Sequence, residues 1–395
     1  MSGPSLIERM RGRGLPFILR RALREVYAPD TRIGRALRPA TAPAWAVFRR
    51  LHDAWHAPSD TDASDRRDTL TLFYDLEVAP ITYDLTVFLA VGEAERRRLG
   101  LRDLAVVFVP GRKDGVRAEM KAYEEAIGPD ARRWRLHNLC IPLTTLVPSC
   151  RGYTLCRARD EAVALHRACG KYVLPENYSP FFPMPPDTRD LIRMSKAGQE
   201  LKVFASPPPA LAYVRAWLAD KLEGRRLITI TLRDSAFTPQ RNSNLAAWTE
   251  FARELDPRAY FVVFIPDSEN AWRPMPERGR DCVAFREACW NVGLRSAIYE
   301  LAWLNLGSSG GPLGLCNFNP KARYLMFKIV TPDVPQATAS VLAERGYVIG
   351  EQPPFVGPGQ EWVWEPDDLE VIRRAFQRMA ARLEAGEAVP ARSAP

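Results

Sequence analysis

The sequence predicts an α/β fold in which parallel sheets and helices alternate through two successive domains. Three observations favour this fold. Apolar segments rich in β-branched and aromatic residues recur along the chain, as at 69–76 (TLTLFYDL) and 259–267 (AYFVVFIPD). A stretch with the apolar spacing of a helix follows each of them. Polar or glycine-rich residues come where these segments end, which is the edge of a parallel sheet at which ligands bind.

The first half of the chain alternates regularly between predicted strands and helices. The strand at 69–76 leads through a polar loop to Asp84, which can cap the helix at 85–99. The next elements are a strand at 104–109, a helix near 116–127, a strand at 152–157 and a helix at 158–169. Residues 174–187 hold five prolines, a density that ends regular structure and makes a stiff connector.

The second half repeats the alternation and ends in a closing helix. The predicted elements are a helix at 209–222, strands at 227–232 and 260–265, a helix at 297–303, a strand at 304–307, a strand at 322–330, a helix at 333–345 and a closing helix at 367–383. We therefore expect five parts: a basic arm with its linker at 1–65, Rossmann-like domains at 66–185 and 186–365, the closing helix at 366–383 and a disordered tail at 384–395.

The positive charge is concentrated at one end of the chain. The net charge is +8, and the first 57 residues hold eleven arginines against four acidic residues. Two amphipathic stretches there, 6–27 and 44–55, suit an arm on an anionic membrane surface, or an arm packed on the main body. The body is nearly neutral, so we expect no nucleic-acid partner. Seven cysteines without a CxxC pair indicate reduced thiols and a cytoplasmic protein. The basic arm also allows peripheral attachment to the inner face of the membrane.

A glycine-rich loop at 307–312 is the first candidate for ligand binding. It contains Ser308, Ser309, Gly310 and Gly311 between a short strand and a helix. Glycines let the backbone approach a ligand closely, and free N–H groups at a helix start attract phosphate. A tight structural turn is the alternative. The segment also fits GxSxG, but the hydrolase triad needs a later histidine and none follows His166.

Arginines and small polar residues follow two strands of the second half. Arg233 stands at a strand end and Arg241 eight residues later, where both can neutralise a diphosphate. Asn244 opens the next helix and can bind a ligand or simply cap that helix. Asp267 ends its strand, where it can hold sugar hydroxyls or only form a turn.

Two carboxylates near the exit of the first strand are candidates for a general base. Asp75 ends the strand at 69–76, and Asp84 precedes the helix that follows it. A carboxylate there can take the proton from an acceptor hydroxyl. Helix capping and turn formation are the alternatives for both.

The segments ITITLRDS…RNSN and LNLGSSGGPLGL carry a resemblance to a known family. The first resembles the strand-end arginine region of fucosyltransferase-like proteins, and the second resembles the phosphate loop of heptosyltransferase-like enzymes. Both are sugar-nucleotide-dependent glycosyltransferases of the GT-B type. The resemblance covers roughly residues 69–383 in architecture. It implies two Rossmann-like domains facing a cleft, with a carboxyl-terminal helix that often crosses back to the first domain.

The resemblance also implies a reaction and its partners. The first domain would take a glycan or lipid-linked acceptor, and the second a nucleotide-sugar donor, so no separate cofactor is expected. Arg233 and Arg241 would stabilise the leaving diphosphate without a metal ion. The only DxD, at residues 60–62, lies in the polar linker, which agrees with that mechanism. A role in polysaccharide biosynthesis follows from the family. An epimerase or hydrolase of the same fold, or a non-catalytic nucleotide- or partner-binding protein, stays open.

Overall fold

A computed structural model describes residues 68–386 except 113, 170–171, 177, 184–187 and 276–281, together with Ala36, Pro39, Ala40, Pro43 and Val47. The linker with its DxD, the tail beyond residue 386 and nearly all of the predicted amphipathic arm lie outside these residues. Membrane contact by the arm therefore stays a prediction. Within the described residues, no helix combines the length and the apolar character that a membrane span requires.

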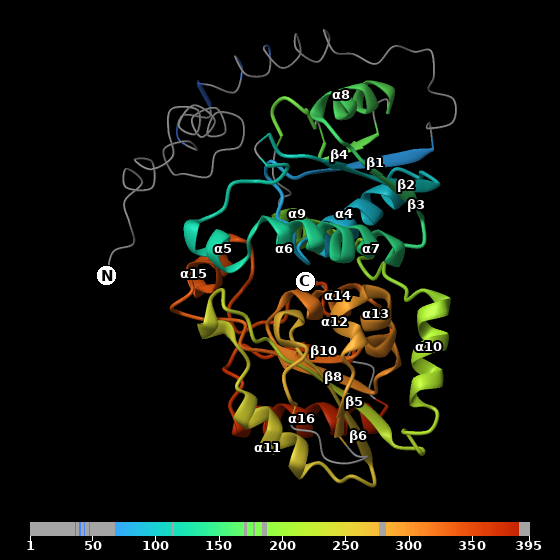
Figure 1. The fold of residues 1–395 in the computed structure, drawn as a ribbon, viewed down its shortest axis with the longest axis vertical. Helices are drawn as coiled ribbons and strands as arrows, with labels where there is room; N and C mark the ends of the chain where they lie inside the picture. Colours follow the sequence, from blue (N-terminus) through green and yellow to red (C-terminus); the bar gives the residue numbers. More distant parts are fainter. Residues whose placement is uncertain are drawn as a thin grey trace. The chain divides into compact units, whose positions relative to one another are not determined.

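The chain divides into two compact units. One contains residues 1–67 and 163–171, including the carboxyl end of α8 (Arg159–Ala168). The other contains residues 68–162 and 172–395 and carries both sheets. We call its first sheet with helices α4–α7 and α9 the first lobe, and its second sheet with helices α10–α16 the second lobe (Figure 1).

The first lobe is built on four parallel strands in the order β3-β2-β1-β4. The strands are β1 (Thr69–Asp75), β2 (Asp103–Val109), β3 (Cys150–Leu155) and β4 (Val173–Leu174). Every residue of β1 is buried, which explains why this segment shows no polar alternation in the sequence. The helices are α4 (Leu85–Arg98), α5 (Lys121–Ala126), α6 (Pro129–Arg135), α7 (Ile141–Leu143) and α9 (Thr188–Lys196), with a π-helical turn at Leu136–Cys140.

The second lobe has six parallel strands in the order β10-β9-β8-β5-β6-β7. The strands are β5 (Arg226–Thr231), β6 (Tyr260–Ile265), β7 (Cys282–Ala284), β8 (Leu304–Ser308), β9 (Tyr324–Phe327) and β10 (Gln360–Trp362). The strand order reverses between β5 and β8, and the crevice outside the carboxyl ends of such a pair is where open α/β sheets bind ligands. The helices are α10 (Pro208–Leu218), α11 (Leu245–Glu254), α12 (Glu287–Trp290), α13 (Val292–Leu301), α14 (Gly314–Phe318), α15 (Ala339–Glu344) and α16 (Leu369–Glu384).

These two parallel sheets confirm the predicted α/β fold class of two Rossmann-like halves. The apolar segment 141–147 forms short helical turns, with Pro142 in the first turn. Two local features differ from the prediction. The predicted helix near 116–127 begins only at Lys121 and forms α5, and a separate helix, α6, follows after Gly128. The short strands β7 and β10 were not predicted.

The closing helix α16 stays within the second lobe. It packs against α11, and Ile372, Phe376 and Met379 are buried with residues of β5, β6 and β8. The crossing back to the first domain that the family resemblance implied is therefore absent from α16. Helix α9, which follows the proline-rich segment, packs instead on α4 of the first lobe. The chain then passes between the lobes, where the amides of Val203 and Phe204 donate to the carbonyl of Phe318.

Candidate functional site

The two lobes meet where α4 begins and where the glycine loop (residues 307–312) ends. A Cβ atom on Gly311 would lie 2.8 Å from Cδ2 of Tyr83, and one on Gly314 would lie 3.2 Å from Oγ1 of Thr86. A side chain at residue 311 would therefore require the tyrosine ring to move. The loop predicted to bind a ligand thus lies against the turn that carries Tyr83 and Asp84.

The glycine loop presents two free backbone amides. Gly310 is extended, and Gly311 begins a 3-10 turn that continues into α14. Within the described part of the chain, the N–H groups of Gly310 and Gly311 donate no hydrogen bond. The amide of Ser309 donates to the carbonyl of Phe327 at 2.6 Å, and Ser308 is buried. Gly310 and Gly311 can therefore receive an anion, whereas the serines hold the loop to the sheet.

Arg241 is the cation closest to the glycine loop. Its Nη2 donates to the carbonyl oxygen of Ser309 at 3.1 Å and contacts the Ser309 hydroxyl at 3.4 Å. Burial lowers the pKa of Arg241; the carboxylate of Asp84 opposes this shift, and the guanidinium of Arg345 adds to it. Arg345 follows α15, and its guanidinium makes no hydrogen bond or ion pair with any described residue. Arg241 is thus held to the loop by hydrogen bonds, and the charges of Asp84 and Arg345 act on it.

The side chain of Arg233 holds together the loop that carries Arg241. It makes no hydrogen bond to the glycine loop. Its guanidinium donates to the carbonyl of Phe237 at 2.5 Å, to the carbonyl and hydroxyl oxygens of Thr238 at 3.0 Å each, and to Oδ1 of Asn242. Burial, together with the charge of Arg241, lowers the pKa of Arg233 to about 10. Both terminal nitrogens of Arg233 thus donate within residues 233–242 and hold this loop in place, and its contact with a diphosphate stays a prediction.

A buried carboxylate that the sequence prediction missed connects the glycine loop to the helices behind it. Asp367 is 2% exposed and accepts hydrogen bonds from Oγ of Ser308 at 2.7 Å, Nε1 of Trp248 at 3.0 Å and the amide of Asn244 at 2.8 Å. Nζ of Lys328 lies 3.5 Å from its other oxygen. These contacts fix the end of β8, and with it the start of the loop.

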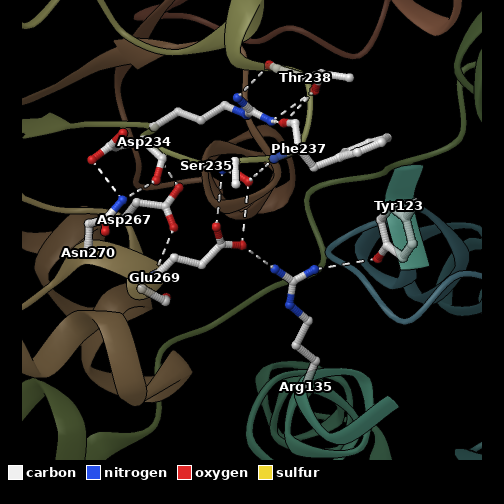
Figure 2. A network of polar contacts seen from close by, with 12 residues as sticks. Tyr123, Arg135, Asp234, Ser235, Phe237, Thr238, Asp267, Glu269 and Asn270 are labelled. Carbon is white, nitrogen blue, oxygen red and sulfur yellow. Dashed lines mark hydrogen bonds and ion pairs between the residues drawn. The ribbon is translucent and has the colours of Figure 1, made fainter. Parts of the chain in front are cut away.

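Asn244 and Asp267 both cap helical turns. The side chain of Asn244 accepts a hydrogen bond from the amide of Ala247 at 3.2 Å, as expected of an N-cap of α11. Asp267 accepts from the amides of Glu269 at 3.1 Å and Asp234 at 3.2 Å (Figure 2). The capping alternative therefore describes Asn244, and Asp267 ties the ends of β5 and β6 together.

An ion pair joins the two lobes beside this network. Arg135 at the end of α6 points at Glu269, with Nη2 3.0 Å from Oε1 (Figure 2). The carboxylate of Glu269 also accepts from the hydroxyl of Ser235 at 3.4 Å. Tyr123 of α5 packs edge-on against Phe237, with ring centroids 4.9 Å apart. Arg135 and Tyr123 of the first lobe thus hold the segment 234–238, which leads to Arg241.

The two predicted bases have different environments. Asp75 is 2% exposed and forms a bidentate ion pair with Arg159, at 2.8 and 2.9 Å, while Tyr178 donates to it at 2.6 Å. A carboxylate so occupied holds the loops after β1 together and is not poised to take a proton. Asp84 is exposed, and its carboxylate accepts no hydrogen bond from the described residues. Of the two, only Asp84 is free to act on a ligand.

Metal ligands do not converge here. In the part of the chain that the structure describes, no group of three or more His, Cys, Asp or Glu residues is arranged to hold a metal ion. The cation that contacts the glycine loop in this part of the chain is the guanidinium of Arg241.

Similarity to known proteins is found among solved structures. No protein-family model matches the sequence, and no curated protein matches it. The chain is similar to ADP-heptose LPS heptosyltransferase II of E. coli, with 10% identity and a TM-score of 0.48 over 81% of this chain and 100% of that chain. A family 9 glycosyl transferase from Veillonella parvula gives 10% identity and a TM-score of 0.43 over 82% and 99%.

A fucosyltransferase is also among the similar structures. The NodZ α-1,6-fucosyltransferase co-crystallized with GDP has 15% identity and a TM-score of 0.27 over 66% of this chain and 95% of that chain. At these values the similarity concerns the arrangement of the chain and assigns no activity to it.

Three functional candidates escaped the sequence prediction for separate reasons. Arg345 follows a short helix far along the chain from Arg241, so no spacing connects them. Asp367 opens the closing helix and reads as an ordinary cap. Tyr83 lies in the loop before α4, and no local pattern shows that its ring contacts Gly311.

Proposed function

We propose that the chain is a glycosyltransferase that moves a sugar from a nucleotide-sugar donor to a hydroxyl of a glycan or glycolipid acceptor. One arrangement carries this proposal. The free carboxylate of Asp84 in the first lobe lies near Arg241 of the second lobe, beside the free amides of Gly310 and Gly311. Such a transfer needs a base for the acceptor hydroxyl and a site for the donor diphosphate.

Each side chain has a chemical role in the proposed reaction. The diphosphate of the donor accepts hydrogen bonds from the amides of Gly310 and Gly311 and is neutralised by Arg241 and Arg345. The acceptor oxygen attacks the anomeric carbon as the bond from that carbon to the phosphate oxygen breaks. Asp84 takes the acceptor proton, and the nucleoside diphosphate leaves with the electron pair of the broken bond. Because arginines supply the charge, we propose a metal-independent mechanism.

Thermal unfolding with ADP, GDP, UDP and CDP tests the donor site. We expect one nucleotide to raise the melting temperature of the full chain by several degrees at concentrations far above its Kd. Arg241→Met should abolish most of that shift. Arg253→Met is the matched control, because Arg253 is exposed on α11 and forms an ion pair with neighbouring Glu250. No shift with any of the four nucleotides would exclude the proposed donor site.

Product analysis then separates transfer from the other reactions. With the nucleotide sugar that fits the preferred base, Asp84→Asn should keep nucleotide binding and lower the rate of transfer by at least about a hundredfold. Sugar release without an acceptor would indicate a hydrolase, and a changed sugar on an intact nucleotide would indicate an epimerase. Binding without turnover of any tested donor and acceptor would indicate a non-catalytic nucleotide-binding protein.

A further inference from the structure

Two tryptophans of the second lobe are exposed to solvent. Trp272 is 74% exposed, the highest value among the exposed large hydrophobic residues in the described part of the chain, and Trp290 at the end of α12 is 53% exposed. Tryptophan is highly buried on average, because its ring removes a large apolar area from water. Exposed aromatic rings of this size are typical of surfaces that a ligand or a partner covers.

The turn that carries Trp272 is held in place on both sides of the ring. Arg286 donates from Nε to the carbonyl of Ala271 at 2.9 Å and from Nη2 to the carbonyl of Arg273 at 3.4 Å. The exposure of Trp272 is therefore a property of a fixed turn. A molecule that binds to a ring fixed in this way pays little for ordering the turn.

Trp290 lies on the neighbouring segment and contacts the first lobe. The hydroxyl of Ser268 donates to the carbonyl of Cys289 at 2.8 Å, so the turn with Trp272 and the segment with Trp290 run next to each other. The ring of Trp290 packs edge-on against the partly exposed Trp134 of α6, with ring centroids 5.4 Å apart. We call these three tryptophans the tryptophan surface.

The tryptophan surface lies at the same edge of the second sheet as the proposed donor site. Trp272 follows β6 and Trp290 follows β7, and the glycine loop follows β8 of the same parallel sheet. Nδ2 of Asn270 donates to the carbonyl and to the carboxylate of Asp234 at 2.7 Å each (Figure 2). The turn with Trp272 is thereby attached to the segment 234–238, which leads to Arg241.

The charges beside the rings are balanced. The guanidinium of Arg273 lies 5.8 Å from the ring centroid of Trp272 and forms an ion pair with Asp234 at 3.0 Å. Arg135, next to Trp134 in the chain, forms the ion pair with Glu269. Each of these cations has a carboxylate beside it. An anionic membrane or a nucleic acid needs an excess of positive charge, so neither matches this surface.

We propose that the tryptophan surface binds sugar rings of an oligosaccharide acceptor, away from the hydroxyl that reacts. The C–H faces of a pyranose ring are apolar and stack on aromatic rings. Its hydroxyl groups both donate and accept hydrogen bonds, so they match a border that offers guanidinium donors and carboxylate acceptors together. The inference rests on the proposed function for the role of the glycan as acceptor. It adds that the acceptor is a chain of several sugars.

Calorimetric titration of the full chain tests this surface with the disaccharides and the hexasaccharides of the maltose, cellobiose and chitobiose series. We expect at least one hexasaccharide to bind, and to bind more tightly than its own disaccharide. Trp272→Ala and Trp290→Ala should each weaken that binding about three- to tenfold, because an aromatic contact is lost. Tyr153→Ala, at an exposed tyrosine of β3, is the control and should bind like the wild type. The melting temperature of Trp272→Ala should stay close to that of the wild type.

Equal binding of the hexasaccharides by the wild type and by both tryptophan variants would overturn the proposal, as would failure of every oligosaccharide to bind. Two further measurements check for another occupant. Loss of self-association in the variants, or loss of binding to vesicles of phosphatidylcholine and phosphatidylglycerol, with unchanged sugar binding, would assign the surface to a second copy or to a membrane instead. Sugar binding through the tryptophans without a response to any of the four nucleotides would overturn the proposed function and leave the tryptophan surface standing.

Discussion

Asp367 and Ser308 are joined by a 2.7 Å hydrogen bond that connects the start of α16 with the end of β8. The same carboxylate is held by Trp248 and Asn244 at the start of α11. Lys328, its charged neighbour, has the left-handed backbone angle φ of 58°, which is unusual for a residue other than glycine. A residue keeps this backbone angle only where its surroundings hold it in place. Asp367 contacts both Lys328 and Ser308, so it positions the start of the glycine loop.

The first prediction therefore concerns Asp367→Asn. The change removes the charge that faces Lys328 and places an amide N–H among groups that already donate, so we expect a loss of about 3 kcal/mol in the free energy of unfolding. Nucleotide binding should weaken as well, because the end of β8 is no longer held. Urea unfolding measures the first effect. Asp368→Asn is the control, since Asp368 is exposed and its side chain makes no cap hydrogen bond; equal losses in both variants would contradict the role of Asp367.

The second prediction uses the contact between Gly311 and Tyr83. Gly311→Ala places a methyl group 2.8 Å from the tyrosine ring, so the ring must move, at a cost of about 1–3 kcal/mol in stability. Gly310→Ala is the matched change next to it: its nearest contact would be an ordinary 3.6 Å and its backbone is extended. We expect a lower melting temperature only for Gly311→Ala. Adding Tyr83→Ala should restore part of the loss, and no restoration would show that the clash lies elsewhere.

The sequence predicted more of the fold than of the site. The strands at 69–75 and 260–265 are buried on both faces, so their sequences are almost continuously apolar. Such sequences are typical of central parallel strands. The strands β7 and β10 have three residues each, too few to show a period. Helix α16 was correctly placed by its apolar spacing, but spacing does not say which partner covers the apolar face.

Within the site, the sequence indicated residue types and sheet edges but not hydrogen-bond partners. Arg233 and Arg241 look equivalent in the sequence, yet Nη1 and Nη2 of Arg233 donate to Phe237, Thr238 and Asn242. Asp75 and Asp84 likewise follow one strand, and only the fold brings Arg159 onto the first of them. These distinctions depend on contacts between segments far apart in the chain, which no local pattern records.

The third prediction concerns the ion pair between Arg135 and Glu269. Both side chains are partly exposed, so Arg135→Gln should change the free energy of unfolding by less than about 1 kcal/mol. The pair nevertheless holds residues 234–238, and their amide hydrogens should exchange faster in the variant. Arg133→Gln on the same helix, which breaks an exposed pair with Asp130, is the control. Hydrogen exchange with mass spectrometry measures the difference; unchanged exchange in 234–238 would show that the aromatic contact of Tyr123 with Phe237 suffices.

The last prediction is a pH dependence of stability that comes from Lys202. Its Nζ donates to the carbonyl of Asn317 at 2.5 Å and to Gln360, and desolvation by burial lowers its pKa from 10.5 to about 8. Between these values the unfolded chain binds more protons at this group than the folded chain, so its contribution to the free energy of unfolding rises with pH. Below about pH 8 both states are protonated and the contribution is constant.

Comparison with Lys202→Met isolates this group from tyrosines and cysteines, such as Cys316, whose raised pKa values act in the opposite direction at alkaline pH. We expect the stability of the wild type relative to the variant to increase by about 2 kcal/mol from about pH 7.5 to about pH 9.5. Urea unfolding of both proteins at these two pH values measures the change. Lys221→Met, at a half-buried lysine that pairs with exposed Asp220, should instead follow the wild type. A constant difference between the wild type and Lys202→Met would mean that Lys202 is not desolvated in the folded protein.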